Sequence, residues 1–71
     1  MSDYPDSDEL AAMLQRQLAP TIPGVVVGVD DAAAELVVYV PRSVRLATGA
    51  VPRMFEGADV RVERIGAVRP A

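Results

Sequence analysis

The 71-residue chain predicts a small α+β domain, with the order helix, strand, strand, short helix, strand. Three observations predict this class. An apolar stripe at helical spacing precedes Pro20, two valine-rich runs flank an acidic, alanine-rich link, and a third run of alternating residues lies near the C-terminus. We therefore expect a three-stranded sheet with the helices on one of its faces.

The first element is a helix that we expect to start after Asp6 and to end at about Ala19. Asp6 and Glu9 have the spacing of a capping box, and the residue before Pro20 is pushed out of the α region. Residues 1–6 are expected to form a disordered tail. The apolar stripe of the helix consists of Leu10, Met13, Leu14 and Leu18.

Two strands are expected over residues 25–29 and 36–40, because both runs are rich in valine and place apolar side chains at alternate positions, on one face of a strand. The link between them carries Asp30 and Asp31 and lacks an Asn-Gly pair. A loop of about five residues is therefore favoured over a tight two-residue turn.

Residues 52–57 predict a short helix, since Pro52 suits the first helical position and Gly57 suits the position just past the end. Met54 or Phe55 would anchor it to the sheet. Strand three follows, with Val60 and Val62 on the buried face. We expect one domain over residues 7–66 and a loose tail over 67–71. The whole is similar to a truncated ferredoxin-like sandwich.

Alternation assigns the side chains to two faces of this sheet. The face under the helices should carry Val25, Val27, Val29, Leu36, Val38, Val40, Val60 and Val62. The opposite face is either an ordinary solvated surface or a protein-docking surface, because tyrosine and arginine around an apolar centre are typical of interface hot spots. The candidate interface residues are Val26, Val37, Tyr39, Arg61 and Glu63.

Composition excludes several classes of site. The chain has no cysteine and no histidine, which removes disulfides, thiolate or histidine metal sites and histidine-based triads. No apolar run approaches the ~20 residues of a membrane span, and the acidic N-terminus is unlike a secretory signal. We expect a cytoplasmic protein without membrane contact. Without disulfides or a thiolate or histidine metal site, so small a domain must be stabilised by good packing or by self-association.

Charge is distributed unevenly along the chain. Residues 1–41 hold seven acidic residues and one arginine, whereas residues 42–71 hold six arginines and three acidic residues, for a net charge of −3. An acidic total argues against sequence-independent binding of nucleic acid. The asymmetry instead favours pairing between complementary halves of two copies.

Little in the sequence points to catalysis. Ser43 has no base as partner, and Asp30-Asp31 lacks the spacing and the glycine of a calcium loop. The glycines match no phosphate-binding loop. Three arginines form either a solvated rim or a contact for an anion or an acidic partner: Arg42, Arg45 and Arg53. We expect no catalytic residue, cofactor, metal or small-molecule substrate.

Three segments carry a resemblance to a known family: residues 22–26 (IPGVV), residues 36–40 (LVVYV) and residues 51–63 (VPRMFEGADVRVE), followed by Gly66. Together they resemble a small domain that precedes some bacterial trypsin-like serine proteases. The likeness spans about residues 10–69. One departure is the phase of the glycine in residues 27–30 (VGVD), and no catalytic residue is carried over, because these 71 residues hold no protease domain. The domain is expected to be either part of a larger protein or encoded alone. The resemblance implies a bacterial, noncatalytic accessory domain.

The favoured function is a protein-interaction or assembly module that binds a protein partner or forms a homodimer. The principal alternative is a prodomain-like inhibitor or folding helper of a trypsin-like protease, acting through the tail at residues 66–71 and Arg69. Further alternatives are a nucleic-acid-associated regulator and a structural component of a shell or virion.

Overall fold

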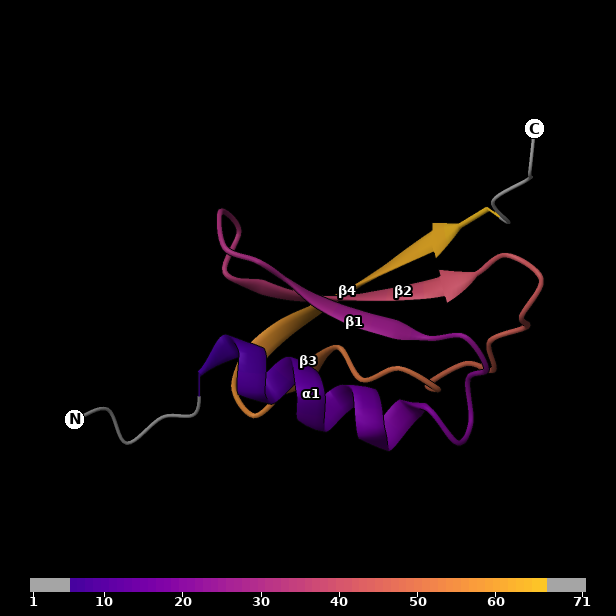
Figure 1. Cartoon of the computed structure of the whole chain (residues 1–71), viewed down its shortest axis with the longest axis horizontal. Coiled ribbons are helices and arrows are strands. Elements are labelled where there is room, and N and C mark those ends of the chain that lie inside the picture. Colours follow the sequence, from indigo (N-terminus) through magenta and orange to yellow (C-terminus); the bar gives the residue numbers. More distant parts are fainter. Residues whose placement is uncertain (1–5, 67–71) are drawn as a thin grey trace.

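A computed structural model describes residues 6–66 of the chain (Figure 1). The sheet has the strand order β1-β2-β4-β3, in which β2 and β4 are parallel and the two outer pairs are antiparallel. The expected tails at residues 1–5 and 67–71 lie outside the described residues. The elements are α1 (Ser7–Leu18), β1 (Val26–Asp30), β2 (Glu35–Pro41), β3 (Met54–Phe55) and β4 (Ala58–Ile65).

Helix α1 starts and ends close to the predicted positions. The backbone N–H of Leu10 donates to the Asp6 carbonyl at 2.9 Å, which closes the first turn. The Asp6 side chain makes no capping hydrogen bond, so the predicted capping box is wrong. The helix ends at Leu18 with Ala19 as its C-cap, as expected from Pro20.

The core lies between α1 and the first two strands of the sheet. α1 packs on β1 and β2, whereas β4 makes few or no contacts with the helix. Seven of the eight residues predicted for the face under the helix are buried in this core or pack partly buried against it. The predicted burial of Val62 is wrong: it is 40% exposed, because α1 does not reach over that part of β4. The buried core consists of Leu10, Ala11, Leu14, Leu18, Ile22, Val25, Leu36, Val38 and Val40.

The predicted short helix at residues 52–57 is wrong. Met54 and Phe55 form strand β3, and Glu56 and Gly57 make a two-residue turn into β4. Both turn residues have positive φ, 52° for Glu56 and 83° for Gly57, as a type I′ hairpin requires. Gly57 therefore serves a hairpin turn and not a helix end. The sheet gains a fourth strand, and Phe55 packs against the core from β3.

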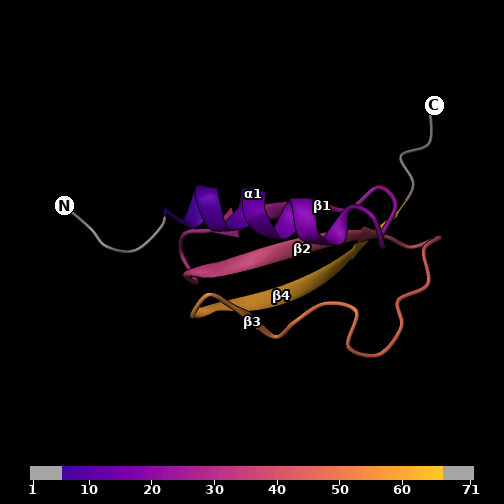
Figure 2. The same ribbon diagram turned by 90° about the horizontal axis from the view of Figure 1, so that it is seen from below.

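Residues 42–53 form a segment without helix between β2 and β3 (Figures 1 and 2). It runs on the α1 side of the sheet, and Val44, Leu46 and Val51 pack partly buried against the core. The Arg64 guanidinium donates to the carbonyls of Arg42 and Val44 and holds the start of this segment. With one helix and a four-stranded sheet, the domain is α+β, but the ferredoxin-like arrangement is not confirmed.

The link between β1 and β2 is slightly shorter than predicted. Four residues, 31–34, separate Asp30 from Glu35, and Ala34 has a φ of 54°. The Asp30 Oδ1 accepts a hydrogen bond of 3.2 Å from the backbone N–H of Ala33, which closes an Asx-type turn.

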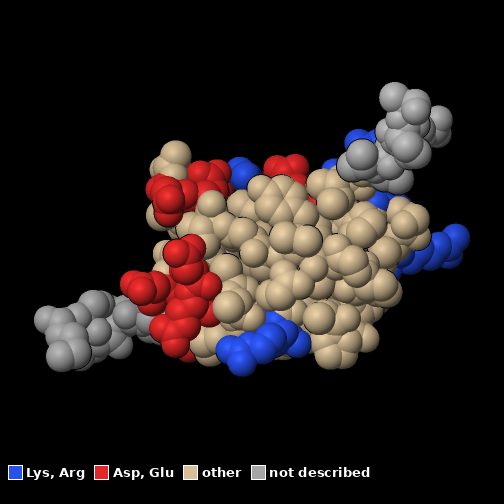
Figure 3. Space-filling model, viewed as in Figure 1, with Lys and Arg blue, Asp and Glu red and all other residues tan. Residues whose placement is uncertain are grey.

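The charge asymmetry of the sequence becomes a separation in space (Figure 3). Acidic side chains gather at the end of the molecule where α1 begins and the β1–β2 link lies, on the left in the view. A cluster of basic side chains projects from the opposite end, beyond the end of β2. The molecule thus carries opposite charge at its two ends.

Candidate functional site

The sheet face opposite α1 is the predicted docking surface, and strand register shows which side chains share it. Val26 lies opposite Tyr39, Gly28 opposite Val37, and Val37 in turn opposite Arg61 on β4. The register extends this face to residues that were not predicted as contacts. Its members are Val26, Gly28, Asp30, Glu35, Val37, Tyr39, Pro41, Asp59, Arg61, Glu63 and Ile65.

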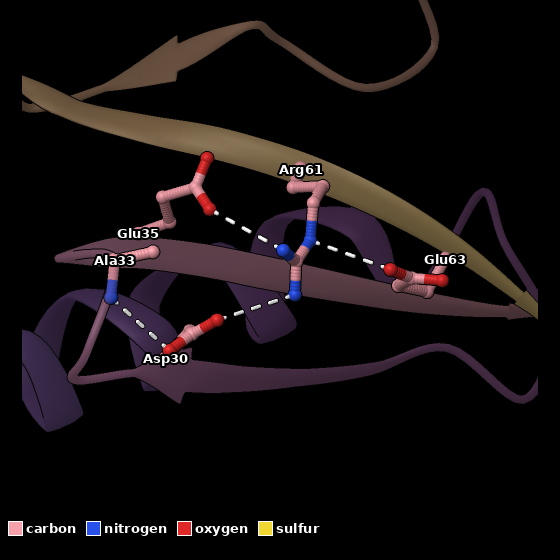
Figure 4. Close-up of polar contacts among 5 residues, drawn as sticks. All are labelled: Asp30, Ala33, Glu35, Arg61 and Glu63. Atoms are coloured by element: carbon pink, nitrogen blue, oxygen red, sulfur yellow. Dashed lines mark hydrogen bonds and ion pairs between the residues drawn. The ribbon is translucent and has the colours of Figure 1, made fainter.

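One half of this face is a network of ion pairs around a single guanidinium (Figure 4). Arg61 Nη2 lies 3.3 Å from Asp30 Oδ2, Nη1 lies 3.5 Å from Glu35 Oε1, and Nε lies 3.4 Å from Glu63 Oε1. The partners come from β1, β2 and β4, so Arg61 connects three strands. One positive and three negative groups leave this half with a net negative charge.

The Arg61 side chain also covers a buried valine. Val37 is 1% exposed although it points away from α1. Because Arg61 starts on β4 and reaches Asp30 on β1, its side chain crosses β2 over Val37. On the other side the Tyr39 ring lies against Gly28, where an added Cβ would be 3.4 Å from Tyr39 Cε2.

Val37 therefore offers no surface to a partner, and its predicted place at the centre of the interface is corrected. Arg61 is exposed, but it is already paired with three carboxylates of the same chain. The sequence could not show this, because Asp30 and Arg61 are 31 residues apart and meet only through the sheet order.

The other half of the face is apolar, and we call it the apolar patch: Val26, Tyr39, Pro41 and Ile65. Val26 is 53% exposed opposite Tyr39, and Ile65 is 39% exposed opposite Pro41. Sequence reasoning missed Pro41 and Ile65, because the expected second strand stopped at residue 40 and the third was assigned only through Val60 and Val62. Strand parity was the available signal, since each lies two residues beyond a predicted contact residue, Tyr39 or Glu63. Glu63 borders the patch through its pairing with Tyr39.

A further polar contact closes part of the outer edge of β1. The Gln15 amide Nε2 donates to the Val25 carbonyl at 2.6 Å, and the Val27 N–H donates to Gln15 Oε1 at 2.7 Å. The side chain thus occupies edge groups that a neighbouring strand would use. Sequence reasoning assigned Gln15 no role, and no local signal could have revealed this contact between helix and strand.

The other candidate groups of residues 6–66 lie on the surface. Ser43 is exposed, as are Arg42, Arg45 and Arg53. This part of the chain holds no cluster of three or more metal-ligating side chains and encloses no pocket. None of its helices has both the length and the apolar character needed to cross a bilayer.

Comparison with protein-family models, with curated proteins and with solved structures gives no match. The resemblance to the domain that precedes trypsin-like proteases therefore stays a prediction. The tail of the proposed inhibitor, apart from Gly66, lies outside the described residues.

Proposed function

We propose that this domain is a noncatalytic protein-interaction module that forms a weak homodimer through the apolar patch. The observation that carries the proposal is the exposure of Val26, 53%, beside Tyr39, Pro41 and Ile65 on one continuous area of the sheet face. Removal of apolar surface from water drives association at roughly 25 cal/mol per Å². The apolar patch is the part of this face that gains most from being covered.

Charge supports a second copy as the partner. The acidic end of the molecule lies at the β1–β2 link, at the far end of the strands from Pro41 and Ile65. When two copies meet patch to patch about a twofold axis, their acidic ends point away from each other. Exposed Arg42 and Glu63 flank the patch with opposite charges, so each can face its counterpart on the other copy.

The size of the patch supports weak association. A stable interface buries ~800 Å² on each partner, which would be a sizeable share of the 5379 Å² of accessible surface of this molecule. Four side chains supply only part of such an interface. We therefore expect a dissociation constant on the order of 100 μM to 1 mM, unless a larger protein holds two such domains together. The resemblance to protease-associated domains favours an enzyme as this larger protein, with the domain as its accessory part.

The test is a series of ¹H–¹⁵N NMR spectra of the full chain at increasing concentration, from roughly 20 μM to roughly 1 mM. We expect progressive shifts at Val26, Tyr39 and Ile65, with a sedimentation coefficient that rises over the same range. Val26→Glu should abolish both changes. The control is Met13→Glu, which places the same charge on α1 at a residue that is 37% exposed.

Two results would contradict the proposal. One is a strict monomer with concentration-independent spectra, and the other is an equal effect of Val26→Glu and Met13→Glu.

A further inference from the structure

The outer edge of β4 is open along most of its length. β3 pairs only with Ala58 and Asp59, and one further bond joins the Val60 N–H to the Arg53 carbonyl at 2.9 Å. Because successive residues of a strand turn their backbone polar groups to opposite sides, Val62 and Arg64 direct theirs to the same outer side as Val60. No strand of residues 6–66 pairs with them there.

The two edges of the sheet are therefore different. At the β1 edge, Gln15 bonds the Val25 carbonyl and the Val27 N–H. At the β4 edge the Arg64 side chain, which could shield the strand, is turned away to the carbonyls of Arg42 and Val44. Exposed apolar side chains accompany the open stretch: Val62 is 40% and Ile65 39% exposed. An unshielded edge beside apolar side chains is a site for strand addition.

A second copy of the chain fits this edge poorly. A twofold dimer through it pairs β4 with its own copy antiparallel, with outward-pointing residues opposite each other. If Val62 faces Val62 of the second copy, Arg64 meets Val60, whose N–H is already bonded to Arg53. A shift of two residues places Glu63 opposite Glu63, and a shift of four places Arg64 opposite Arg64. Like charges directly opposite destabilise an antiparallel pair.

We infer that the β4 edge binds an extended segment of a different protein, which adds a fifth strand beside residues 61–65. The segment should carry an apolar residue beside Val62 on the α1 side and a basic residue beside Glu63 on the other side. The charge follows from the Arg61 network, in which one guanidinium is shared among three carboxylates and Glu63 borders the open edge. This inference concerns the backbone edge of β4, which shares only Ile65 with the apolar patch, and it does not depend on dimerisation.

The probes are two synthetic hexapeptides added to the full chain, acetyl-Lys-Val-Lys-Val-Lys-Val-amide and its counterpart with Glu in place of Lys. The lysine peptide should give saturable NMR shifts at residues 61–65 and slow the hydrogen exchange of the Val62 and Arg64 amides. The Val29 amide, on the β1 edge, should be unaffected. We expect the glutamate peptide to bind about tenfold more weakly.

Two variants test the assigned groups. Val62→Pro removes an outward N–H while leaving the bonds to β2, and it should abolish binding. Glu63→Lys leaves the backbone edge intact, so it is informative even if the proline variant does not fold. It should reverse the preference between the two peptides.

The inference is overturned if neither peptide gives saturable shifts, if both bind equally, or if the shifts map to Val26 and Tyr39. It is also overturned if Val62 becomes protected as protein concentration rises without peptide, because a second copy would then occupy the edge. Dimerisation through the apolar patch is read from Val26 and Tyr39, which lie outside residues 61–65, so either proposal can fail while the other holds.

Discussion

The two halves of the sheet differ in how they are covered. Under α1, the core side chains of β2 are buried, and Leu14, Val38 and Val40 are completely inaccessible. Val27 and Val29 of β1 pack partly buried against this core. In the β3–β4 half, Val60 is only partly buried and Val62 is 40% exposed on the same side of the sheet. Met54, on β3, is 57% exposed.

Element size explains this difference. A helix with its side chains is ~10 Å wide and strands are ~4.8 Å apart, so one helix covers about two strands. A four-stranded sheet requires a second cover, and here residues 42–53 provide it without a helix. The comparison teaches that one half holds the domain together while the other keeps surface and strand edge available for contact.

The largest expected difference between the halves concerns a single core leucine. Leu14→Ala should lower the free energy of unfolding by about 3 kcal/mol, because Leu14 is fully buried between α1 and the sheet. That is a large share of the ~5 kcal/mol typical of a small domain. Val62→Ala, in the other half, should cost below ~1 kcal/mol. Urea denaturation measures both, and equal losses would show that the halves are not different in packing.

The turns that lead into the two halves can be compared through two glycines with positive φ, Gly24 before β1 and Gly57 before β4. Gly24 has a φ of 75°, and a Cβ added there would lie 3.0 Å from Pro41 Cγ, whereas Gly57 has a φ of 83° and open space. Backbone strain alone should cost about 1 kcal/mol in Gly57→Ala. Gly24→Ala should cost about 2 kcal/mol, because the contact with Pro41 adds to it. Similar midpoints of thermal unfolding for the two variants would rule out that contact as a constraint.

Substitutions of Arg61 separate two ways in which this side chain can hold β4 to the first two strands: its ion pairs and its cover over the apolar side chain of Val37. Arg61→Ala should destabilise by about 1.5 kcal/mol, since it uncovers Val37 and leaves three carboxylates close together. Arg61→Met retains an unbranched apolar chain over Val37 and should recover about half of that loss, because exposed ion pairs contribute little. Equal losses in urea denaturation would assign the whole effect to charge.

The smallest effect on stability concerns the two edges. Gln15→Met removes the hydrogen bonds to Val25 and Val27 and should cost about 1 kcal/mol. Its clearer result is local, because hydrogen exchange of the Val27 amide should become faster, approaching that of the Val62 amide on the open edge. Unchanged exchange at Val27 would mean that Gln15 does not close the β1 edge.

The fold was predictable where the signal was local. The stripe of α1 and the alternation of β1, β2 and β4 led to the correct faces for most residues, since each depends on residues two to four positions apart. Met13 and Val62 are exceptions, because both were expected on the packed faces and are exposed. Residues 52–57 were misassigned, because Pro52 and Gly57 are compatible with both a short helix and a hairpin turn. Pairing with β4, which lies later in the chain, selects the hairpin.

The candidate site was predictable only in part. Val26 and Tyr39 were correctly placed on the accessible face, and Glu63 on its border. Val37 was misjudged because its cover depends on how far the Arg61 side chain reaches across the sheet. Pro41 and Ile65 were missed because both strands extend further than predicted, to Pro41 in β2 and to Ile65 in β4.

By itself the sequence determined most of the core side chains of α1 and β2 and excluded sites that need cysteine or histidine, because hydrophobic periodicity and composition do not depend on topology. Tertiary structure alone decided the parallel pairing of β2 with β4, the Arg61 network, and the contrast between a closed and an open edge. The physical reason is distance along the chain. Interactions between residues tens of positions apart exist only once the strand order has brought them together.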